Sequence, residues 1–216
     1  QLILLKGSDI ESQNSRDKFG FETKFRVSPR GFGNYGGDKV FDMEEVVISA
    51  KSFSFEDYIE ARKHHLTYMV FWSQDWFNDL FQYARNLGIK YSTCGEAMVE
   101  AMDLDKGEVM KFMLEFMEET KGELFLTEEE CIKFYTGENH FEKLIAGEIG
   151  DNLLNKYHAM ASFVLWPQIC KLATNVVKEI LLTHASDKLE PGFDHFWADL
   201  CRFVEFKHAT GQTLGD

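Results

Sequence analysis

The sequence predicts a mainly α-helical protein with a small β part. An N-terminal strand and an antiparallel hairpin form the edge of a partial barrel, and a helical bundle follows. Residues 2–5 are an uninterrupted apolar run, which is typical of a buried strand. Residues 21–28 alternate between apolar and polar side chains, the two-residue period of a half-buried strand. From Ser54 onward, apolar residues recur every three or four positions, as on one face of a helix. We therefore divide the chain into residues 1–52, the end of a partial barrel with its hairpin, and residues 53–216, a helical C-terminal domain.

The apolar strand of residues 2–5 is expected to have a neighbour on each side, because a strand that is apolar on both faces is usually buried in a sheet. Few candidates for parallel partners follow it. We therefore expect the chain to be the C-terminal piece of a longer protein. A later strand, residues 39–49, pairs with the alternating strand, and the glycine-rich residues 29–38 between them predict a hairpin with a long loop.

The helical part contains clear start and stop signals. A hydroxyl residue followed three positions later by an acidic one predicts helix starts at Ser54 and at Thr127. Pro167 lacks an amide hydrogen and predicts a break in the helical pattern of residues 151–182. Pro191 begins the last helix. The aromatic and methionine stripes of these helices are interpreted as core rather than as a cofactor pocket.

Charge and composition exclude several classes of partner. The chain has 36 acidic and 23 basic residues, and its net charge of -13 repels nucleic-acid phosphates. No run approaches the roughly 20 apolar residues of a membrane span, and no signal peptide opens the chain. We therefore expect a cytoplasmic protein with neither nucleic acid nor membrane as a partner. Isolated cysteines, without C-x-x-C pairs, are expected to be reduced thiols: Cys94, Cys131, Cys170 and Cys201.

The glycines Gly31, Gly33 and Gly36 have the spacing of a dinucleotide-binding fingerprint. That motif requires a strand before it and a helix after it, and here a strand follows. A glycine loop between antiparallel strands also covers ATP in protein kinases, with Lys51 as a candidate phosphate ligand, but no H-R-D or D-F-G segment is present. We favour a hairpin loop whose glycines adopt positive φ angles.

No complete catalytic or metal-binding constellation is evident. Glu205-x-x-His208 matches half of a di-iron carboxylate pattern, whose second half is absent. Glu60, His64 and His65 could place two ligands on one helix, but sequence supplies no converging third group. The chain also lacks a G-x-S-x-G nucleophile elbow. We predict no catalytic residue and no metal ligand in this chain.

Arg26 and Arg30 bracket the rigid Pro29 at the entrance of the glycine-rich segment. Two interpretations remain open from the spacing. The guanidinium groups could face a bound carboxylate, which they recognise with two parallel hydrogen bonds. Alternatively, they are ordinary surface arginines that pair with the abundant acidic residues.

Several segments together resemble the C-terminal region of radical SAM enzymes that carry a cobalamin-binding domain. The resemblance covers about the first third of the chain, and no single motif in it is as specific as a cluster-binding cysteine triplet. The residues that carry it are Leu4-Leu5-Lys6-Gly7-Ser8-Asp9, Arg16, Lys24-Phe25-Arg26-Val27-Ser28-Pro29-Arg30, Phe32-Gly33, Ser54-Phe55-Glu56-Asp57-Tyr58, Arg62 and His65.

In that family, a cobalamin domain precedes a partial barrel whose C-x-x-x-C-x-x-C loop binds a [4Fe-4S] cluster, and S-adenosylmethionine is cleaved to a radical. This chain has no such triplet, so the resemblance implies that the S-adenosylmethionine, cluster and cobalamin sites lie upstream, in the N-terminal remainder of the same polypeptide. The implied role of this chain is to close the barrel and shape the substrate cavity of an enzyme such as a methyltransferase, without catalysis of its own. The implied substrate-binding residues are Arg26, Arg30, Tyr35, Arg62 and His65.

A function from another class remains as the alternative. The acidic surface and helical grooves of residues 53–216 also suit a non-catalytic helical domain that binds a protein partner. A cysteine triplet encoded upstream in the same reading frame distinguishes the enzyme from this alternative.

Overall fold

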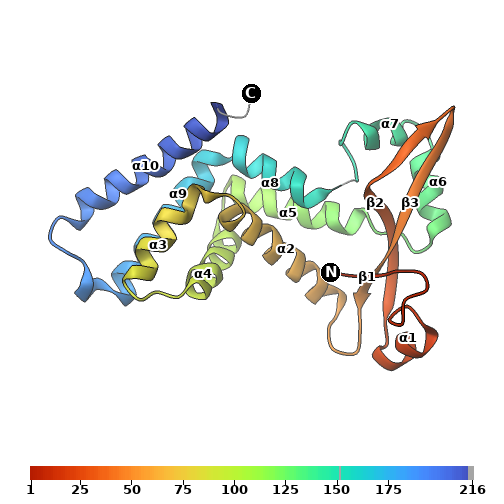
Figure 1. Ribbon diagram of the computed structural model, residues 1–216, viewed down its shortest axis with the longest axis horizontal. Helices are drawn as coiled ribbons and strands as arrows, with labels where there is room; N and C mark the ends of the chain where they lie inside the picture. The colour runs from red at the N-terminus through yellow and green to blue at the C-terminus, as the bar shows by residue number, and fades with distance from the viewer. Residues whose placement is uncertain (151, 214–216) are drawn as a thin grey trace. The chain divides into compact units, whose positions relative to one another are not determined.

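The computed structural model describes residues 1–150 and 152–213, and its elements follow the predicted order of a strand, a hairpin and then a series of helices, with the short helix α1 between β1 and β2 (Figure 1). The three strands are β1 (Leu2–Leu4), β2 (Glu22–Tyr35) and β3 (Asp38–Ser49). The helices are α1 (Gln13–Phe19), α2 (Phe55–Trp72), η1 (Asp75–Phe77), α3 (Asn78–Asn86), α4 (Tyr91–Leu104), α5 (Glu108–Gly122), α6 (Glu128–Thr136), α7 (His140–Ile145), α8 (Leu153–Phe163), α9 (Trp166–His184), η2 (Ser186–Lys188) and α10 (Phe193–Thr213). The mainly α fold class with a small β part is confirmed.

The sheet has the order β1-β3-β2, and both pairings are antiparallel. Among the described residues β1 pairs with β3 alone and lies at the edge of the sheet, so a second neighbour from an upstream segment stays a prediction. The fully buried apolar run is instead Val46 and Val47, on the central strand. Leu4 of β1 is buried, whereas Leu2 is 38% exposed, as one face of an edge strand allows. The described sheet is open and does not close into a barrel.

The hairpin is longer and its turn is tighter than predicted. β2 and β3 run as a long ribbon to a two-residue turn at Gly36 and Gly37, which have φ angles of 66° and 105° (Figure 1). The expected loop of residues 29–38 is therefore mostly strand. Its irregularity is a bulge in which residues 28–31 lie opposite Asp42 alone, because the pairs on either side are Val27 with Met43 and Phe32 with Phe41. Pro29 lies in this bulge, where the ladder needs no amide hydrogen.

The predicted helix boundaries correspond to observed caps. The Ser54 backbone N–H donates to the Asp57 carboxylate at 2.8 Å, and the Asp57 N–H donates to the Ser54 hydroxyl at 3.1 Å. The Glu130 N–H donates to the Thr127 hydroxyl at the start of α6. Pro167 stands in the first turn of α9, so the predicted break separates α8 from α9. These are local signals, and the structure confirms them.

The chain forms two compact units. Unit 1 comprises residues 1–63 and 114–157, and unit 2 comprises residues 64–113 and 158 onward. Unit 1 holds the sheet, and α6 packs against both β2 and β3. Each unit is built from two separate stretches of chain, unlike the sequence-based division at residues 52–53.

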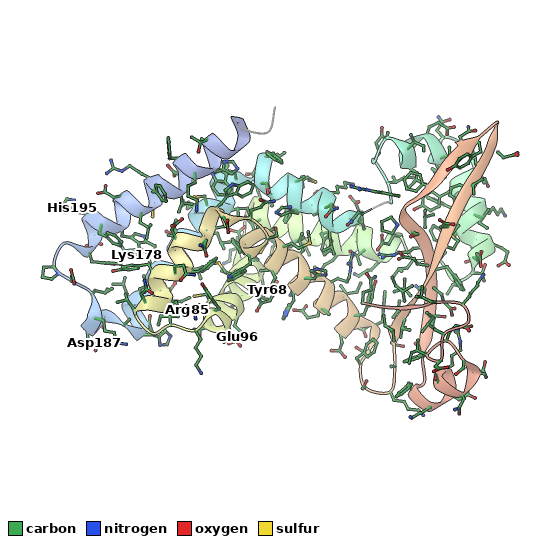
Figure 2. All side chains as sticks on the ribbon, viewed as in Figure 1. Tyr68, Arg85, Glu96, Lys178, Asp187 and His195 are labelled. Atoms are coloured by element: carbon green, nitrogen blue, oxygen red, sulfur yellow. The ribbon has the colours of Figure 1, made fainter. Side chains whose placement is uncertain are left out.

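Unit 2 has a core of stacked aromatic rings and methionines. Phe77 is 1% exposed, and its ring lies 5.5 Å from that of Phe71 and 5.0 Å from that of Trp166. Tyr68 of α2 lies against Gly95 of α4, where an added β-carbon would come within 2.4 Å of the tyrosine oxygen (Figure 2). Glycine at this position therefore leaves room for the Tyr68 ring beside α4. No helix among the described residues is long and apolar enough to cross a membrane.

Candidate functional site

Of the five predicted binding residues, the structure brings Arg26 and Arg62 together in unit 1. Both guanidinium groups are buried, Arg26 on β2 and Arg62 on α2. Arg30 is exposed in the β2 bulge, and Tyr35 is 70% exposed beside the hairpin turn. His65 is exposed on α2 in unit 2. We call the set of buried Arg26, Arg62, Glu123 and Tyr58, together with the half-buried Glu44, the ion cluster.

Arg26 is held by two carboxylates. Its Nε and Nη2 donate to Glu44 Oε2 at 2.9 and 2.7 Å, and its Nη1 donates to Glu123 Oε1 at 2.8 Å. Nη2 also donates to the side-chain oxygen of Gln1 at 3.3 Å. The interpretation of Arg26 as a surface arginine is therefore wrong, although its pairing with acidic residues agrees with that interpretation. All three of its donor nitrogens have partners within the protein.

Arg62 has a weaker set of partners. Its Nη2 lies 4.0 Å from Glu123 Oε1, and its guanidinium carbon lies 5.7 Å from the centre of the Phe116 ring. Its Nε is buried without a hydrogen-bond partner among the described residues. Nearby, the Tyr58 hydroxyl accepts a hydrogen bond of 2.8 Å from the Gln1 side chain. Arg62 therefore depends mainly on the Glu123 charge and on its position over an aromatic ring.

Backbone pairing explains why these side chains meet. Arg26 and Glu44 are cross-strand partners in the β2–β3 ladder. Phe25 and Phe125 exchange two backbone hydrogen bonds of 2.8 Å, which brings the chain after α5 alongside β2. Glu123, two residues before Phe125, thereby reaches Arg26 across 97 positions of sequence.

Burial and neighbouring charges act against each other in the ion cluster. Burial raises the pKa of Glu123, although Arg26 and Arg62 favour its charged form. Burial lowers the pKa of Arg62, and the Glu123 charge opposes this change. For Arg26, burial also disfavours the charge, but Glu123 and Glu44 outweigh it and raise the pKa. The two arginines and two glutamates compensate each other's charge, so the cluster is suited to holding the sheet against α2 and α5.

A hollow of about 310 Å³ lies beside the ion cluster in unit 1, with Glu123 in its lining. Glu119 also lines it and accepts hydrogen bonds from Lys156 Nζ at 2.8 Å and from the Tyr157 hydroxyl at 2.8 Å. Burial raises the pKa of Tyr135, another lining residue, above its ordinary range. The carboxylates of Glu119 and Glu123 are thus engaged by cations or hydroxyls of the protein.

The glycine-rich hairpin has a structural explanation. Gly31 and Gly33 do not have positive φ angles, unlike Gly36 and Gly37, so the predicted positive angles hold only for the turn. A β-carbon at Gly31 would lie 2.9 Å from the side chain of Asp42 across the bulge. Lys51 donates to the main-chain oxygens of Asp17 and Lys18 at the end of α1. Its ammonium group thus supports the end of a helix.

His208 and Glu60, which the sequence offers as candidate metal ligands, contact neighbouring residues of the protein. The His208 ring stacks on Trp166 at 3.6 Å, and its Nε2 lies 2.8 Å from the Ser162 main-chain oxygen. Glu60 forms an ion pair with Lys63 at 2.6 Å. Within the described part of the chain, no three His, Cys, Asp or Glu side chains converge in a way that could hold a metal ion.

The described cysteines do not fit a cluster site. Burial raises the pKa of Cys94 to about 11 and those of Cys131 and Cys170 to about 12, which stabilises the thiol rather than the thiolate that binds iron. Cys131 lies in unit 1, whereas Cys94 and Cys170 lie in unit 2. None of them is arranged as a ligand set.

Comparison with protein-family models, curated proteins and solved structures finds no match. We therefore base the functional proposal on the resemblance carried by the sequence motifs and on the geometry of unit 1.

Proposed function

We propose that this chain is the C-terminal part of a radical SAM enzyme with a cobalamin-binding domain, and that it contributes to the wall of the substrate cavity without catalysing the reaction alone. One observation carries the proposal. Residues 24–33 and residues 54–65, which bear most of the resemblance, share the buried ion cluster through Arg26, Tyr58 and Arg62. The motifs of the resemblance therefore act as one structural element.

A second motif residue strengthens that element. Arg16 of α1 donates from Nη1 and Nη2 to the two carboxylate oxygens of Glu45 on β3, at 2.6 and 2.7 Å. This pairing lowers the pKa of Glu45, and the Thr23 hydroxyl donates to the same carboxylate at 2.7 Å. Paired arginines thus fix both α1 and α2 to the sheet. A wall that is rigid before substrate binds holds its contact residues in place.

The geometry divides the predicted binding residues into two roles. Arg26 and Arg62 are positioning residues, because their guanidinium groups are buried against Glu123. Arg30 and Tyr35 project from the exposed part of the hairpin. In the proposed enzyme, Arg30 contacts an anionic group of the substrate or of S-adenosylmethionine.

The partner implied by this function is the N-terminal remainder of the same polypeptide. That part would hold the [4Fe-4S] cluster, S-adenosylmethionine and cobalamin, which together supply a radical or a methyl group. The described cysteines do not fit the cluster, so this chain's own part is to shape and position.

The proposal is tested first by reading the DNA upstream of the codon for Gln1. A C-x-x-x-C-x-x-C segment encoded in the same open frame supports it, whereas a frame that begins a few codons before Gln1 contradicts it. The full-length protein is then reconstituted with iron and sulfide, and S-adenosylmethionine cleavage is measured. We expect Arg30→Ala to weaken binding by roughly 10-fold to 150-fold, the equivalent of one charged hydrogen bond.

A further inference from the structure

Helices α4 and α9 pack side by side in unit 2 and leave a continuous groove between them. Two hollows of about 340 and 500 Å³ lie along this pair, and both are lined by Ala101, Leu104 and Val176. On α9 the lining extends from Gln168 to His184. At a rise of 1.5 Å per residue this is about 24 Å, the length of four turns of helix. We call this surface the α4/α9 groove.

The groove has an apolar floor with the periodicity of a helix-packing surface. Ala97, Ala101 and Leu104 succeed one another at helical spacing on α4, and Val176 and Ile180 do so on α9. The small alanine side chains allow another backbone to come close, and Leu104 is 68% exposed. Such a floor fits the apolar side of an amphipathic helix.

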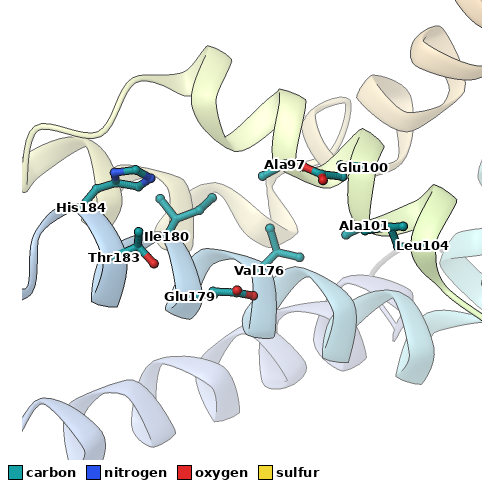
Figure 3. Close-up of a pocket in the computed structure, with 9 residues that line it drawn as sticks. All are labelled: Ala97, Glu100, Ala101, Leu104, Val176, Glu179, Ile180, Thr183 and His184. Carbon is teal, nitrogen blue, oxygen red and sulfur yellow. The ribbon is translucent and has the colours of Figure 1, made fainter.

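Acidic residues predominate at the edges of the groove. Glu100 of α4 and Glu179 of α9 line the same hollow from the two helices (Figure 3). No ion pair of either carboxylate is found in the part of the chain that the structure describes. Asp105 and Glu108 extend the acidic lining, and Lys171 is the lysine among them. The groove therefore has a negative rim on a chain whose net charge is already -13.

We propose that the α4/α9 groove binds a basic amphipathic helix of a protein partner, with aliphatic residues on the floor and Lys or Arg beside Glu100 and Glu179. Charge complementarity selects this occupant, because a second copy of the chain would bring another acidic rim against the first. The elongated shape matches a helix of about four turns. This inference goes beyond the proposed function, since it uses only residues of unit 2.

The test measures binding of a fluorescent 18-residue designed helical peptide to the full chain by anisotropy. Leucine and alanine form one face of the peptide, and lysines flank them. A matched peptide carries glutamates in place of the lysines. We expect the lysine peptide alone to bind, and added salt to weaken its binding. The double variant Glu100→Gln/Glu179→Gln is expected to bind about fivefold more weakly, the loss of two exposed ion pairs.

The matched control is Glu56→Gln/Glu129→Gln, which removes two exposed acidic charges from unit 1 and leaves the net charge equal to that of the groove variant. We expect it to bind the lysine peptide as the parent chain does. Leu104→Ala is expected to weaken binding without a change in melting temperature, because Leu104 is mostly exposed. The proposal is overturned if the control variant weakens binding as much as the groove variant does. It is also overturned if the glutamate peptide binds as tightly as the lysine peptide, or if neither peptide binds. A dimer in sedimentation that Leu104→Ala dissociates also overturns it, in favour of a second copy.

Discussion

The two units differ in what they bury beside the apolar side chains that both contain. Unit 1 buries Arg26 and Arg62 around Glu123, with Arg26 Nη1 2.8 Å from the carboxylate. Unit 2 instead buries stacked rings such as Phe77, which lies between Phe71 and Trp166. An ion cluster is sensitive to each substitution, because a charge that loses its partner is left uncompensated in the interior. A packed aromatic core depends on volume and shape, and it tolerates a substitute of similar size.

This comparison can be tested with spectroscopic probes that separate the two units. The chain has four tryptophans, and all lie in unit 2: Trp72, Trp76, Trp166 and Trp197. Tryptophan fluorescence therefore reports the unfolding of unit 2, whereas far-ultraviolet circular dichroism reports both units. Transitions that differ between the two probes indicate unfolding that is not two-state.

The largest effect is expected from Glu123→Gln, a substitution that preserves size but removes the charge. Arg26 loses one of its two carboxylates, and Arg62 loses the carboxylate nearest to it. Removal of one partner from a buried ion pair typically lowers the free energy of unfolding by about 3–5 kcal/mol. Urea unfolding followed by circular dichroism measures this loss, and the tryptophan transition should move less.

The control for this prediction is Glu118→Gln, in the last turns of α5 a short distance before Glu123. Glu118 pairs with Lys121 at the surface, and an exposed pair of this kind contributes about 0.5 kcal/mol or less. If Glu123→Gln lowers the free energy of unfolding no more than Glu118→Gln does, the buried pairing contributes little to the stability of unit 1.

The corresponding change in unit 2 is Phe77→Leu, which replaces a ring that is 1% exposed by a smaller apolar side chain. We expect the free energy of unfolding to fall by about 1.5 kcal/mol, because neighbouring side chains can occupy part of the space. Phe77→Ala should lower it by about 3–5 kcal/mol, since a cavity remains. Tryptophan fluorescence in urea measures both. If Phe77→Leu lowers the free energy of unfolding as much as Phe77→Ala does, the geometry of the ring contacts matters more than side-chain volume. The contrast between the two units is then weaker than we infer.

Acidification should lower the stability of unit 2. Burial lowers the pKa of His208 and that of His158, both in unit 2, so the unfolded chain binds protons more readily than the folded unit. Stability of unit 2 is then fully present above pH about 6.5 and falls as the pH drops toward the lowered pKa values, by about 1.4 kcal/mol for each unit of pKa difference.

Urea titrations at pH 7.5 and 5.5 test this prediction. The tryptophan midpoint should decrease at pH 5.5, and His208→Gln should reduce the decrease. His195→Gln is the matched control, because His195 is exposed on the same helix (Figure 2). An equal decrease in the parent chain and in His208→Gln contradicts the assignment to His208.

The parts of the fold that the sequence predicts depend on local interactions. Ser54 and Asp57 exchange capping hydrogen bonds across three positions, and Pro167 ends the preceding helix because it has no amide hydrogen. Each feature can therefore be predicted from a few neighbouring residues. The hairpin is different, because Gly31 and Gly33 suggest a loop. Pairing of Phe32 with Phe41 and their packing against the buried residues of unit 1 keep this segment in the sheet.

The ion cluster could be predicted only in part. Arg26 and Arg62 belong to recognisable motifs, but Glu123 lies 97 positions after Arg26 and follows a helix end that resembles many others. The contact depends on the Phe25–Phe125 backbone bridge, and neither residue carries a local signal for it. Long-range charge pairing is therefore the part of the site that the residue pattern does not encode.

The smallest effect on stability, and the sharpest test of the hairpin's role, is expected at Arg30. This residue is exposed and has a φ of 61°, the left-handed region that glycine adopts without strain. Arg30→Gly should raise the free energy of unfolding by up to about 1 kcal/mol, because relief of the left-handed strain exceeds the entropic penalty of glycine. Arg30→Ala keeps a β-carbon and should change the free energy of unfolding by less than about 0.5 kcal/mol.

In the proposed full-length enzyme both variants lose the same guanidinium, so both should bind the anionic ligand at least about 10-fold more weakly. A more stable but poorly binding glycine variant is the result that fits strain retained for function. If both variants bind and turn over as the parent does, the arginine has no role in ligand binding. If the glycine variant is less stable than the alanine variant, the side chain supports the bulge.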